Sequence, residues 1–342
     1  MADSCITIAG SGSYLPEHTI TNDDIARLIG RADRDGGWAW DKLGIRERRF
    51  LTPLDESGFP VGEADELDMA ERAAAKAMAS AGLAPFDVDG LWYISCTQAG
   101  HLRHHFSRSS YLLHQRLGLR HDAVAMEMDA GCGGALHAVI HGMQMLRGGS
   151  MSTMLIVASN APSRFYGNWH AYVSSNQWLP MYVFGDGAGA ILLHKKGRLH
   201  GAGIATAFAG NDPERPLIHF EPSGTSDPIY KIDGRAVAVG YGHYAKKAIA
   251  ALMDAHSFNL ADVDRFYFHQ VNARVLAAFV EKMDIPEQKV AAHIERYGNI
   301  SAAATLVLFD EDRRQGRVSD GDLCLFCAVG AGAQYGAMLV RV

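Results

Sequence analysis

Residues 123–146 read AVAMEMDAGCGGALHAVIHGMQML, and this stretch decides the fold class. Residues 123–129 alternate like a half-buried strand, Gly131 opens a turn, and residues 133–146 have helical periodicity. An apolar strand of the buried type, TMLIVAS, follows at 153–159. A strand, a helix and a second strand in this order indicate a parallel pair joined by a helical crossover.

The same alternation of strands and helices extends along the whole chain. Thr21 to Asp24 resembles a capping box and predicts the start of a helix over 23–29. Glycine-rich segments at 184–190 and 329–333 hint at an internally duplicated fold. We also expect strands at 5–12, 90–96, 264–269, 322–329 and 335–342, helices at about 64–82, 240–256, 272–283 and 301–315, and long loops at 52–63 and 160–181. The chain is therefore predicted to be an α/β protein with a largely parallel sheet covered by helices.

Composition narrows the class of protein. Of 342 residues, 48% are hydrophobic and 20% charged, a balance typical of a globular protein with a sizeable core. The net charge of −6 argues against general binding to nucleic acid or to anionic membranes. No apolar run approaches the roughly 18–20 residues that span a bilayer, and the first residues do not resemble a secretory signal. Five scattered cysteines do not predict a disulfide framework, so we expect a cytoplasmic protein.

Cys132 is the candidate nucleophile. It lies where a strand passes through glycines into a helix, and a helix N-terminus favours thiolate by lowering the pKa of a thiol. Small neighbours leave room for a substrate carbonyl. The other cysteines, Cys5, Cys96, Cys324 and Cys327, are interpreted as structural.

His269 and Asn299 are the candidate partners of Cys132. His269 ends an apolar strand, and the carboxyl ends of strands are where α/β folds place ligand-binding groups. Asn299 follows a glycine and precedes a helix, so an N-cap is its equally simple alternative role.

The ordered motifs of the chain resemble the β-ketoacyl-acyl-carrier-protein synthase III type of the thiolase superfamily. The resemblance extends nearly end to end. Its motifs are GSGSYLPEHTITNDDI, the segment from Trp38 to Arg48, AGCGGA, FGDGAGA, HQVNAR, GNISAA and GAQYGAMLVRV. It implies a five-layer αβαβα fold of two similar halves, residues 1–197 with the cysteine and 198–342 with the histidine and asparagine.

The resemblance also implies a reaction. Cys132 would take an acyl group from acyl-CoA, and a malonyl thioester, on coenzyme A or on acyl carrier protein, would lose carbon dioxide and attack it. His269 and Asn299 would stabilise the enolate, and the backbone N–H groups of Cys132 and Ala331 would bind the oxyanion. Neither a metal nor a redox cofactor is expected.

Further positions follow from the same resemblance. Trp38 would stack on the adenine of coenzyme A, with Lys42 nearby and Arg274 at the tunnel mouth. Phe106 would cross a dimer interface, which predicts a homodimer. Some positions depart from the family pattern: Lys42 replaces an arginine, and Val239 and Glu281 replace basic residues at carrier-docking positions. These departures favour a specialised pathway, such as secondary metabolism.

Three alternatives compete with condensation. An acyltransferase of the same fold would pass the acyl group to a hydroxyl or an amine without decarboxylation. A papain-like protease shares the order Cys, His, Asn, but AGCGGAL lacks the aromatic residue expected after its nucleophile. A catalytically silent subunit would not be expected to keep all three residues.

Other suggestive patterns are not interpreted as sites. His101, His104 and His105 have no neighbouring ligands that would complete a metal site. His137 and His141 share a helix face without further ligands. Cys324 and Cys327 lie three apart in a predicted strand and would therefore point to opposite faces. FGDGAGA lacks a phosphate-loop lysine and is interpreted as tight backbone packing.

Overall fold

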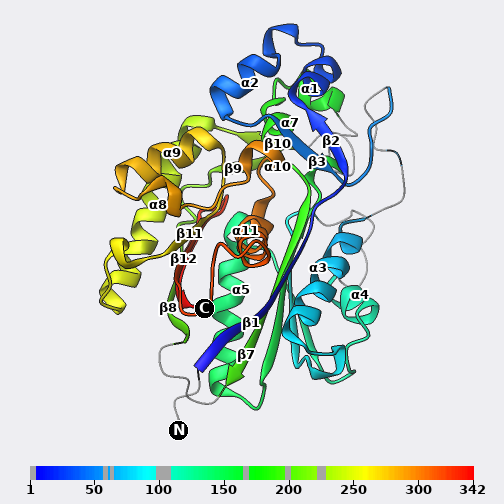
Figure 1. The fold of residues 1–342 in the computed structure, drawn as a ribbon. Coiled ribbons are helices and arrows are strands. Elements are labelled where there is room, and N and C mark those ends of the chain that lie inside the picture. The colour runs from blue at the N-terminus through cyan, green and yellow to red at the C-terminus, as the bar shows by residue number, and fades with distance from the viewer. Residues whose placement is uncertain are drawn as a thin grey trace.

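The structure, a computed structural model, describes residues 5–56, 61, 65–97, 109–164, 169–196, 202–221 and 229–342. Two sheets form its centre (Figure 1). The five-stranded sheet has the order β1 (Cys5–Tyr14), β7 (Gly187–Lys196), β6 (Thr153–Asn160), β4 (Gly90–Ile94) and β5 (Val124–Met128). The four-stranded sheet has the order β11 (Arg265–Phe268), β12 (Leu323–Val329), β13 (Gln334–Arg341) and β8 (Gly203–Asn211).

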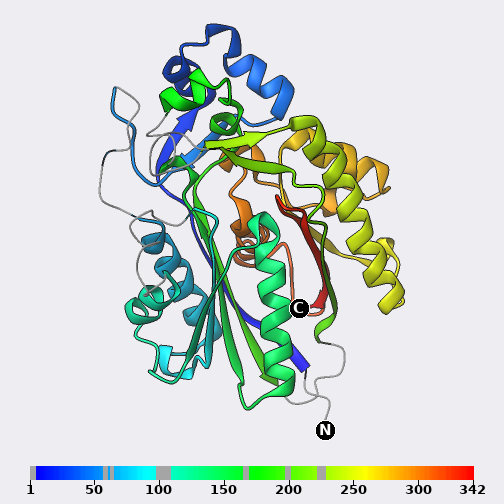
Figure 2. The ribbon, with the colours of Figure 1, turned by 180° about the vertical axis from the view of Figure 1, so that it is seen from behind.

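Helices separate and cover the two sheets in five layers. Helices α5 (Gly134–Gly148) and α11 (Ala304–Arg314) lie between the sheets (Figures 1 and 2). Helices α3 (Glu66–Ala81) and α4 (Ser109–Arg116) cover the outer face of the first sheet. Helices α8 (Gly234–Ala255) and α9 (Ala273–Lys282) cover the outer face of the second. The expected αβαβα layering is confirmed.

Alternation along the buried strands builds a core on each face of each sheet. In β6, Met154 and Ile156 pack into the central layer, while Leu155 and Val157 pack under α3. Successive side chains of a strand point to opposite faces, so a fully apolar strand supplies two cores at once. Each such buried side chain stabilises the fold by roughly 1.5–3 kcal/mol.

A smaller cluster caps the carboxyl ends of the central strands, at the top of Figure 1. The predicted capping box is confirmed, because Thr21 and Asp24 exchange hydrogen bonds at the start of α1. The cap contains strands β2 (His18–Thr21), β3 (Glu47–Phe50), β9 (Ile218–Glu221) and β10 (Ile229–Ile232), and helices α1 (Asn22–Ile29), α2 (Gly36–Leu43), α6 (Trp169–Ser174), α7 (Leu179–Val183) and α10 (Ile294–Tyr297).

The expectation of mainly parallel sheets is wrong: both sheets are mixed. Strand β4 runs parallel to β5 and β6, and β11 runs parallel to β12. The pairs β1–β7, β6–β7, β12–β13 and β13–β8 are antiparallel. The reason lies in the connections, since Asn160 at the end of β6 pairs with Gly187 at the start of β7. When a connection leaves one strand and enters the next at the same end of the sheet, the two strands run antiparallel.

Several boundaries also differ from expectation. The segment 160–181 is not a long loop, because α6 and the start of α7 lie within it. Helix α8 begins at Gly234 and not near 240, since the Asp233 side chain accepts hydrogen bonds from Arg235 N and Ala236 N. The division into halves at residue 197 stays a proposal. It is supported by the sheets, because the first uses only strands before this residue and the second only strands after it.

Candidate active site

Cys132 lies in a short 3₁₀ turn, Gly131–Gly133, between β5 and the start of α5. Gly131 has a φ of +51°, a conformation that glycine adopts without strain. A Cβ on Gly133 would lie 2.9 Å from the carbonyl oxygen of Gln334, so this turn fits tightly against the start of β13. The glycines therefore allow two backbone segments to meet at the thiol, whose residue is only 7% exposed.

The structure brings the three predicted residues together. His269 directly follows β11, and Asn299 follows α10. Nε2 of His269 lies 3.2 Å from Oδ1 of Asn299, and both side chains are buried. With Cys132 they line one cavity of about 20 Å³. The N-cap alternative for Asn299 is wrong, because Ile300 is the N-cap of the following 3₁₀ turn and Ala303 that of α11; Oδ1 of Asn299 nevertheless accepts a hydrogen bond from Ser301 N at 2.8 Å.

Burial sets the protonation of both titratable groups. It lowers the pKa of His269 to about 4, although the hydrogen bond with Asn299 opposes the shift, so the imidazole is neutral near pH 7. Burial raises the pKa of Cys132 to about 11, and a hydrogen bond from Ser301 Oγ only partly offsets this. The expected lowering of the thiol pKa by the helix N-terminus is therefore wrong, because desolvation outweighs it.

The loop that carries Ala331 lies directly against the turn that carries Cys132. A Cβ on Gly131 would lie 3.2 Å from Ala331 N, and a Cβ on Gly330 would lie 3.2 Å from Cys132 N. The Ala331 carbonyl is held from the other side by the N–H groups of Leu217 and Ile218. Both predicted oxyanion donors thus belong to touching segments, and their catalytic role remains a prediction.

A larger cavity of about 240 Å³ also has Cys132 in its lining. Its wall includes Cys96 and Thr97, which follow β4. Below this wall the buried carboxylate of Glu66 accepts hydrogen bonds from Tyr93, Ser95 and Thr97. The remaining lining residues are Asp129, Gly131, Cys132, Pro162, Phe184, Ile218, Ser301, Ala331, Gly332 and Gln334.

The predicted coenzyme A residues Trp38, Lys42 and Arg274 lie on α2 or against it. Trp38 is half-buried and packs edge-on against Trp178 and Tyr182, with ring centroids 5.5 and 5.6 Å away. Lys42 is exposed at the end of the same helix. Arg274 joins α9 to α2 through hydrogen bonds to the carbonyls of residues 40 and 41. Phe106 lies outside the described residues, as do His101, His104 and His105.

Three residues near the site were not predicted from the sequence. Ser301 contacts the Cys132 sulfur, and its signal was its place in GNISAA. Cys96 had been interpreted as structural, yet it lines the cavity. Glu66, at the start of α3, was not singled out in the sequence. No sequence pattern shows that Cys96 or Glu66 approaches the site.

The patterns set aside in the sequence have structural roles. Cys324 packs into the central core and Cys327 into the outer one, which confirms that they face opposite sides of β12. FGDGAGA is closely packed as expected, since a Cβ on Gly189 would lie 3.0 Å from Val307 N, but most of it forms strand β7. The described residues bring together no group of three His, Cys, Asp or Glu side chains that could hold a metal. Among the residues that the structure describes, no helix is long and apolar enough to cross a membrane.

Comparisons with known proteins match this architecture. The model of the 3-oxoacyl-[acyl-carrier-protein (ACP)] synthase III family matches residues 126–213, and that of its C-terminal part matches 253–342. A β-ketoacyl-[acyl-carrier-protein] synthase III from Xanthomonas oryzae pv. oryzae is 30% identical over 343 residues, covering 98% of this chain and 97% of the relative. The chain belongs to the β-ketoacyl-[acyl-carrier-protein] synthase III family. It is a condensing enzyme of the ketoacyl synthase type and a transferase.

Solved structures confirm the thiolase-like fold of this synthase III-family enzyme. FabH from Pseudomonas aeruginosa PAO1 superposes with a TM-score of 0.83 at 25% identity, covering 98% of each chain. OleA from Xanthomonas campestris, solved with bound lauric acid and lauroyl-CoA, superposes with a TM-score of 0.84 at 20% identity, covering 99% of each chain.

Proposed function

We propose that this enzyme joins an acyl group from acyl-CoA to the carbon of a malonyl thioester by decarboxylative Claisen condensation. The observation that carries the proposal is the meeting of Cys132 with a neutral His269 and with Asn299 around one cavity. The relatives support it, because their printed names specify ketoacyl synthesis on acyl carrier protein, and the OleA structure contains lauroyl-CoA.

In the first half-reaction the Cys132 sulfur attacks the acyl-CoA carbonyl. The new carbon–sulfur bond forms as the bond to coenzyme A breaks, and the coenzyme A thiol leaves with the cysteine proton. The N–H groups of Cys132 and Ala331 stabilise the negative oxygen between these events. The cavity of about 240 Å³ beside the sulfur receives the acyl chain.

In the second half-reaction the malonyl thioester loses carbon dioxide. The electron pair of the broken bond becomes an enolate, whose oxygen receives hydrogen bonds from His269 and Asn299. A neutral imidazole suits this role, because Nε2 carries a hydrogen to share. The enolate carbon then attacks the acyl carbonyl, and Cys132 leaves as thiolate. These steps require no metal and no redox cofactor. We propose that the enzyme uses neither.

A basic groove between α8 and α9 is the proposed docking place for the thioester donor. It has a volume of about 610 Å³, and Tyr241 lines both this groove and the catalytic cavity. Its cationic side chains are Lys246, Arg274 and Lys282. These cations suit either the phosphates of coenzyme A or an acidic carrier protein. Trp38 and Lys42 remain our proposed contacts for the nucleotide.

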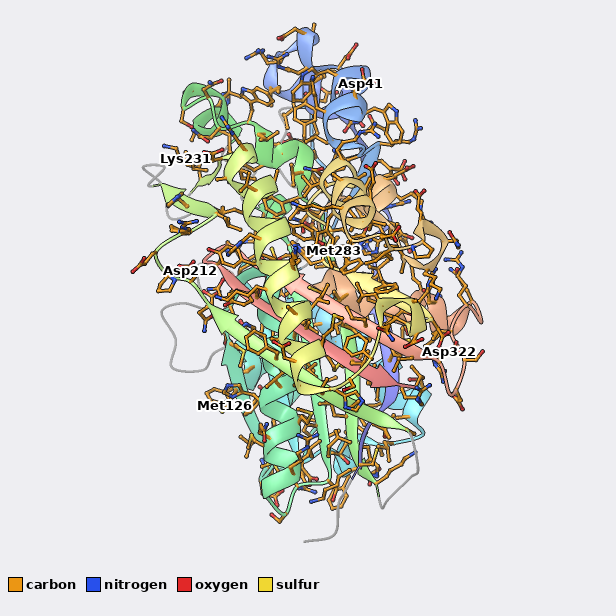
Figure 3. The ribbon with its side chains drawn as sticks, turned by 90° about the vertical axis from the view of Figure 1, so that its left-hand side faces the viewer. Asp41, Met126, Asp212, Lys231, Met283 and Asp322 are labelled. Atoms are coloured by element: carbon orange, nitrogen blue, oxygen red, sulfur yellow. The ribbon has the colours of Figure 1, made fainter. Side chains whose placement is uncertain are left out.

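We also propose a homodimer formed through β5. This strand is at the edge of the five-stranded sheet, and an open edge can pair with a second copy. Met126 on β5 is 53% exposed and lies at the margin of the molecule (Figure 3). Phe106 would reach the partner's acyl pocket. The specialised pathway and the cytoplasmic location also stay as predictions from the sequence.

One assay separates condensation from simple acyl transfer. The enzyme is incubated with a panel of acyl-CoAs and malonyl thioesters, and acyl loading, carbon dioxide and β-keto product are measured. We expect loading on Cys132, none in Cys132→Ala, and carbon dioxide released together with product. Cys5→Ala, at a half-buried cysteine in β1, is the matched control. Ester or amide formation with no condensation product from any malonyl donor would overturn the proposal in favour of the acyltransferase.

A further inference from the structure

A second cysteine is linked to the nucleophile through one hydroxyl. Ser301 Oγ lies 3.4 Å from the sulfur of Cys132 and 3.2 Å from the sulfur of Cys96. All three residues line the cavity of about 240 Å³. Cys96 has no part in the reaction described above, yet its sulfur contacts the same hydroxyl as the sulfur of the nucleophile.

The backbone holds the Ser301 hydroxyl in place. Ser301 has a φ of +55°, which is uncommon for a residue other than glycine. Its N–H is fixed by the hydrogen bond to Oδ1 of Asn299, and the residue is 2% exposed. Such strained residues cluster at functional sites. The conformation therefore fixes where the hydroxyl oxygen lies, while its hydrogen can still rotate between the two sulfurs.

A hydroxyl has one hydrogen, so Ser301 can donate to only one sulfur at a time. A thiolate at Cys132 is the better acceptor, because hydrogen bonds to charged groups are roughly twice as strong as neutral ones. Acylation excludes the thiolate, because the sulfur of a thioester carries no charge. The Cys96 sulfur is then the remaining acceptor, and its own hydrogen can be donated to Oδ1 of Asn160, 3.1 Å away.

We propose that Ser301 is a positioning residue that stabilises the thiolate of Cys132, and that Cys96 accepts its hydrogen bond when Cys132 is acylated. The second part rests on the acyl transfer proposed above. A buried hydroxyl without a partner is unfavourable, so a second acceptor stabilises the acyl-enzyme. The chemistry of loading is unchanged: the coenzyme A thiol still leaves with the proton, and only the hydroxyl rotates.

The first test measures the alkylation of Cys132 by iodoacetamide, which needs no acyl substrate. The rate is followed on the Cys132 peptide by mass spectrometry between about pH 6 and pH 10. Ser301→Gly removes the hydroxyl but suits the positive φ, so the backbone is not strained. We expect the Cys132 peptide of Ser301→Gly to react about tenfold more slowly at each pH, which corresponds to a rise of about one unit in its pKa.

The controls distinguish this effect from a general disturbance. Ser257→Gly, at an exposed serine after α8, should alkylate at the wild-type rate. Cys96→Ala should also leave the alkylation of Cys132 no slower, because Ser301 still donates to the thiolate. A wild-type rate and pH profile in Ser301→Gly would overturn the role of the hydroxyl.

The second test measures the equilibrium of loading. Wild type, Cys96→Ala and the control Cys5→Ala are mixed with a fixed ratio of acyl-CoA to coenzyme A, and the acylated fraction is read by intact mass. We expect the ratio of acyl-enzyme to free enzyme in Cys96→Ala to fall about 3- to 10-fold, as for the loss of one neutral hydrogen bond. An unchanged ratio would overturn the role of Cys96. Failure of the wild type to load would instead overturn the proposed function, and the alkylation rates would still decide the role of Ser301.

Discussion

The backbone N–H of Ser301 donates to Oδ1 of Asn299 at 2.8 Å, and this contact orients the Asn299 amide. Because a backbone N–H can only donate, the accepting atom is the amide oxygen, and the Asn299 nitrogen lies on the other side. Nε2 of His269, 3.2 Å from the same oxygen, must then carry a hydrogen to make a favourable contact. One backbone hydrogen bond thus fixes which atoms of both side chains can donate to a substrate.

Removing the Asn299 amide should separate the two half-reactions. In Asn299→Ala we expect carbon dioxide release and condensation to fall about 100- to 1,000-fold, the usual loss for one oxyanion donor. Acyl loading should fall less than tenfold, because the Cys132 thiol, which forms the first bond, remains. Asn259→Ala, at an exposed residue before a 3₁₀ turn, is the matched control. Equal losses in loading and condensation would contradict a role confined to the second step.

Two buried histidines should make the fold sensitive to acid. Burial lowers the pKa of His269 to about 4 and that of His293 to about 3. In the unfolded chain each histidine has its ordinary pKa near 6.5 and binds a proton below that pH, while in the folded chain it stays neutral. The free energy of unfolding should therefore fall as the pH drops below about 6.5, by about 1.4 kcal/mol per pH unit for each histidine.

Urea unfolding between about pH 6.5 and pH 5 measures this dependence. His293→Gln removes one titrating group and should reduce the slope by about 1.4 kcal/mol per pH unit. His256→Gln, at an exposed histidine just after α8, should leave the slope unchanged. An unaltered slope in His293→Gln would show that this imidazole is not held neutral in the folded protein.

The turn around Cys132 should not tolerate a methyl group. A Cβ on Gly133 would meet the Gln334 carbonyl at 2.9 Å, whereas one on Gly148, at the other end of α5, would meet nothing within 4 Å. We expect Gly133→Ala to displace the oxyanion donors and slow acyl loading about 100-fold, as small misplacements in active sites do. Gly148→Ala should load normally. Normal loading in Gly133→Ala would mean that the two segments can separate without consequence.

A charge on the edge strand should prevent the proposed dimer. Met126→Arg places a cation on β5, where strand pairing would bury it, so we expect a monomer by light scattering. Phe86→Arg is the matched control, because Phe86 is 73% exposed and lies in a 3₁₀ turn before β4, outside the edge strand itself. A monomeric wild type, or a dimer that persists in Met126→Arg, would contradict the interface.

Helices and strands were predictable from the sequence where the hydrophobic periodicity and the positions of the glycines indicate the same boundaries. The helix expected at 64–82 is α3, Glu66–Ala81, and the strand at 153–159 is β6, Thr153–Asn160. Strand β7 was missed because its two leading glycines resemble a turn, although here the second, Gly189, allows α11 to approach closely. Strand direction also depends on where a connection returns to the sheet, which local patterns do not encode.

The same distinction applies to the site. Cys132, His269 and Asn299 each stand at a recognisable junction of elements, so their types and places could be predicted together. Cys96 and Ser301 are 205 residues apart and meet because the turn that contains Ser301 packs against the first sheet. The thiol pKa was predicted in the wrong direction, because a sequence shows the helix terminus but not the depth of burial.

Helices α5 and α11 share the central layer, with Cys132 just before the first and Asn299 shortly before the second. His269 comes from the second sheet, so the reactive centre exists only where both sheets have closed on these helices. Turnover therefore shows that the two sheets have packed on the central helices. Two separately expressed pieces, cut between the sheets, would each be inert, and condensation would return only as they recombine. The rate of condensation is therefore a measure of the fraction of the enzyme that is fully folded.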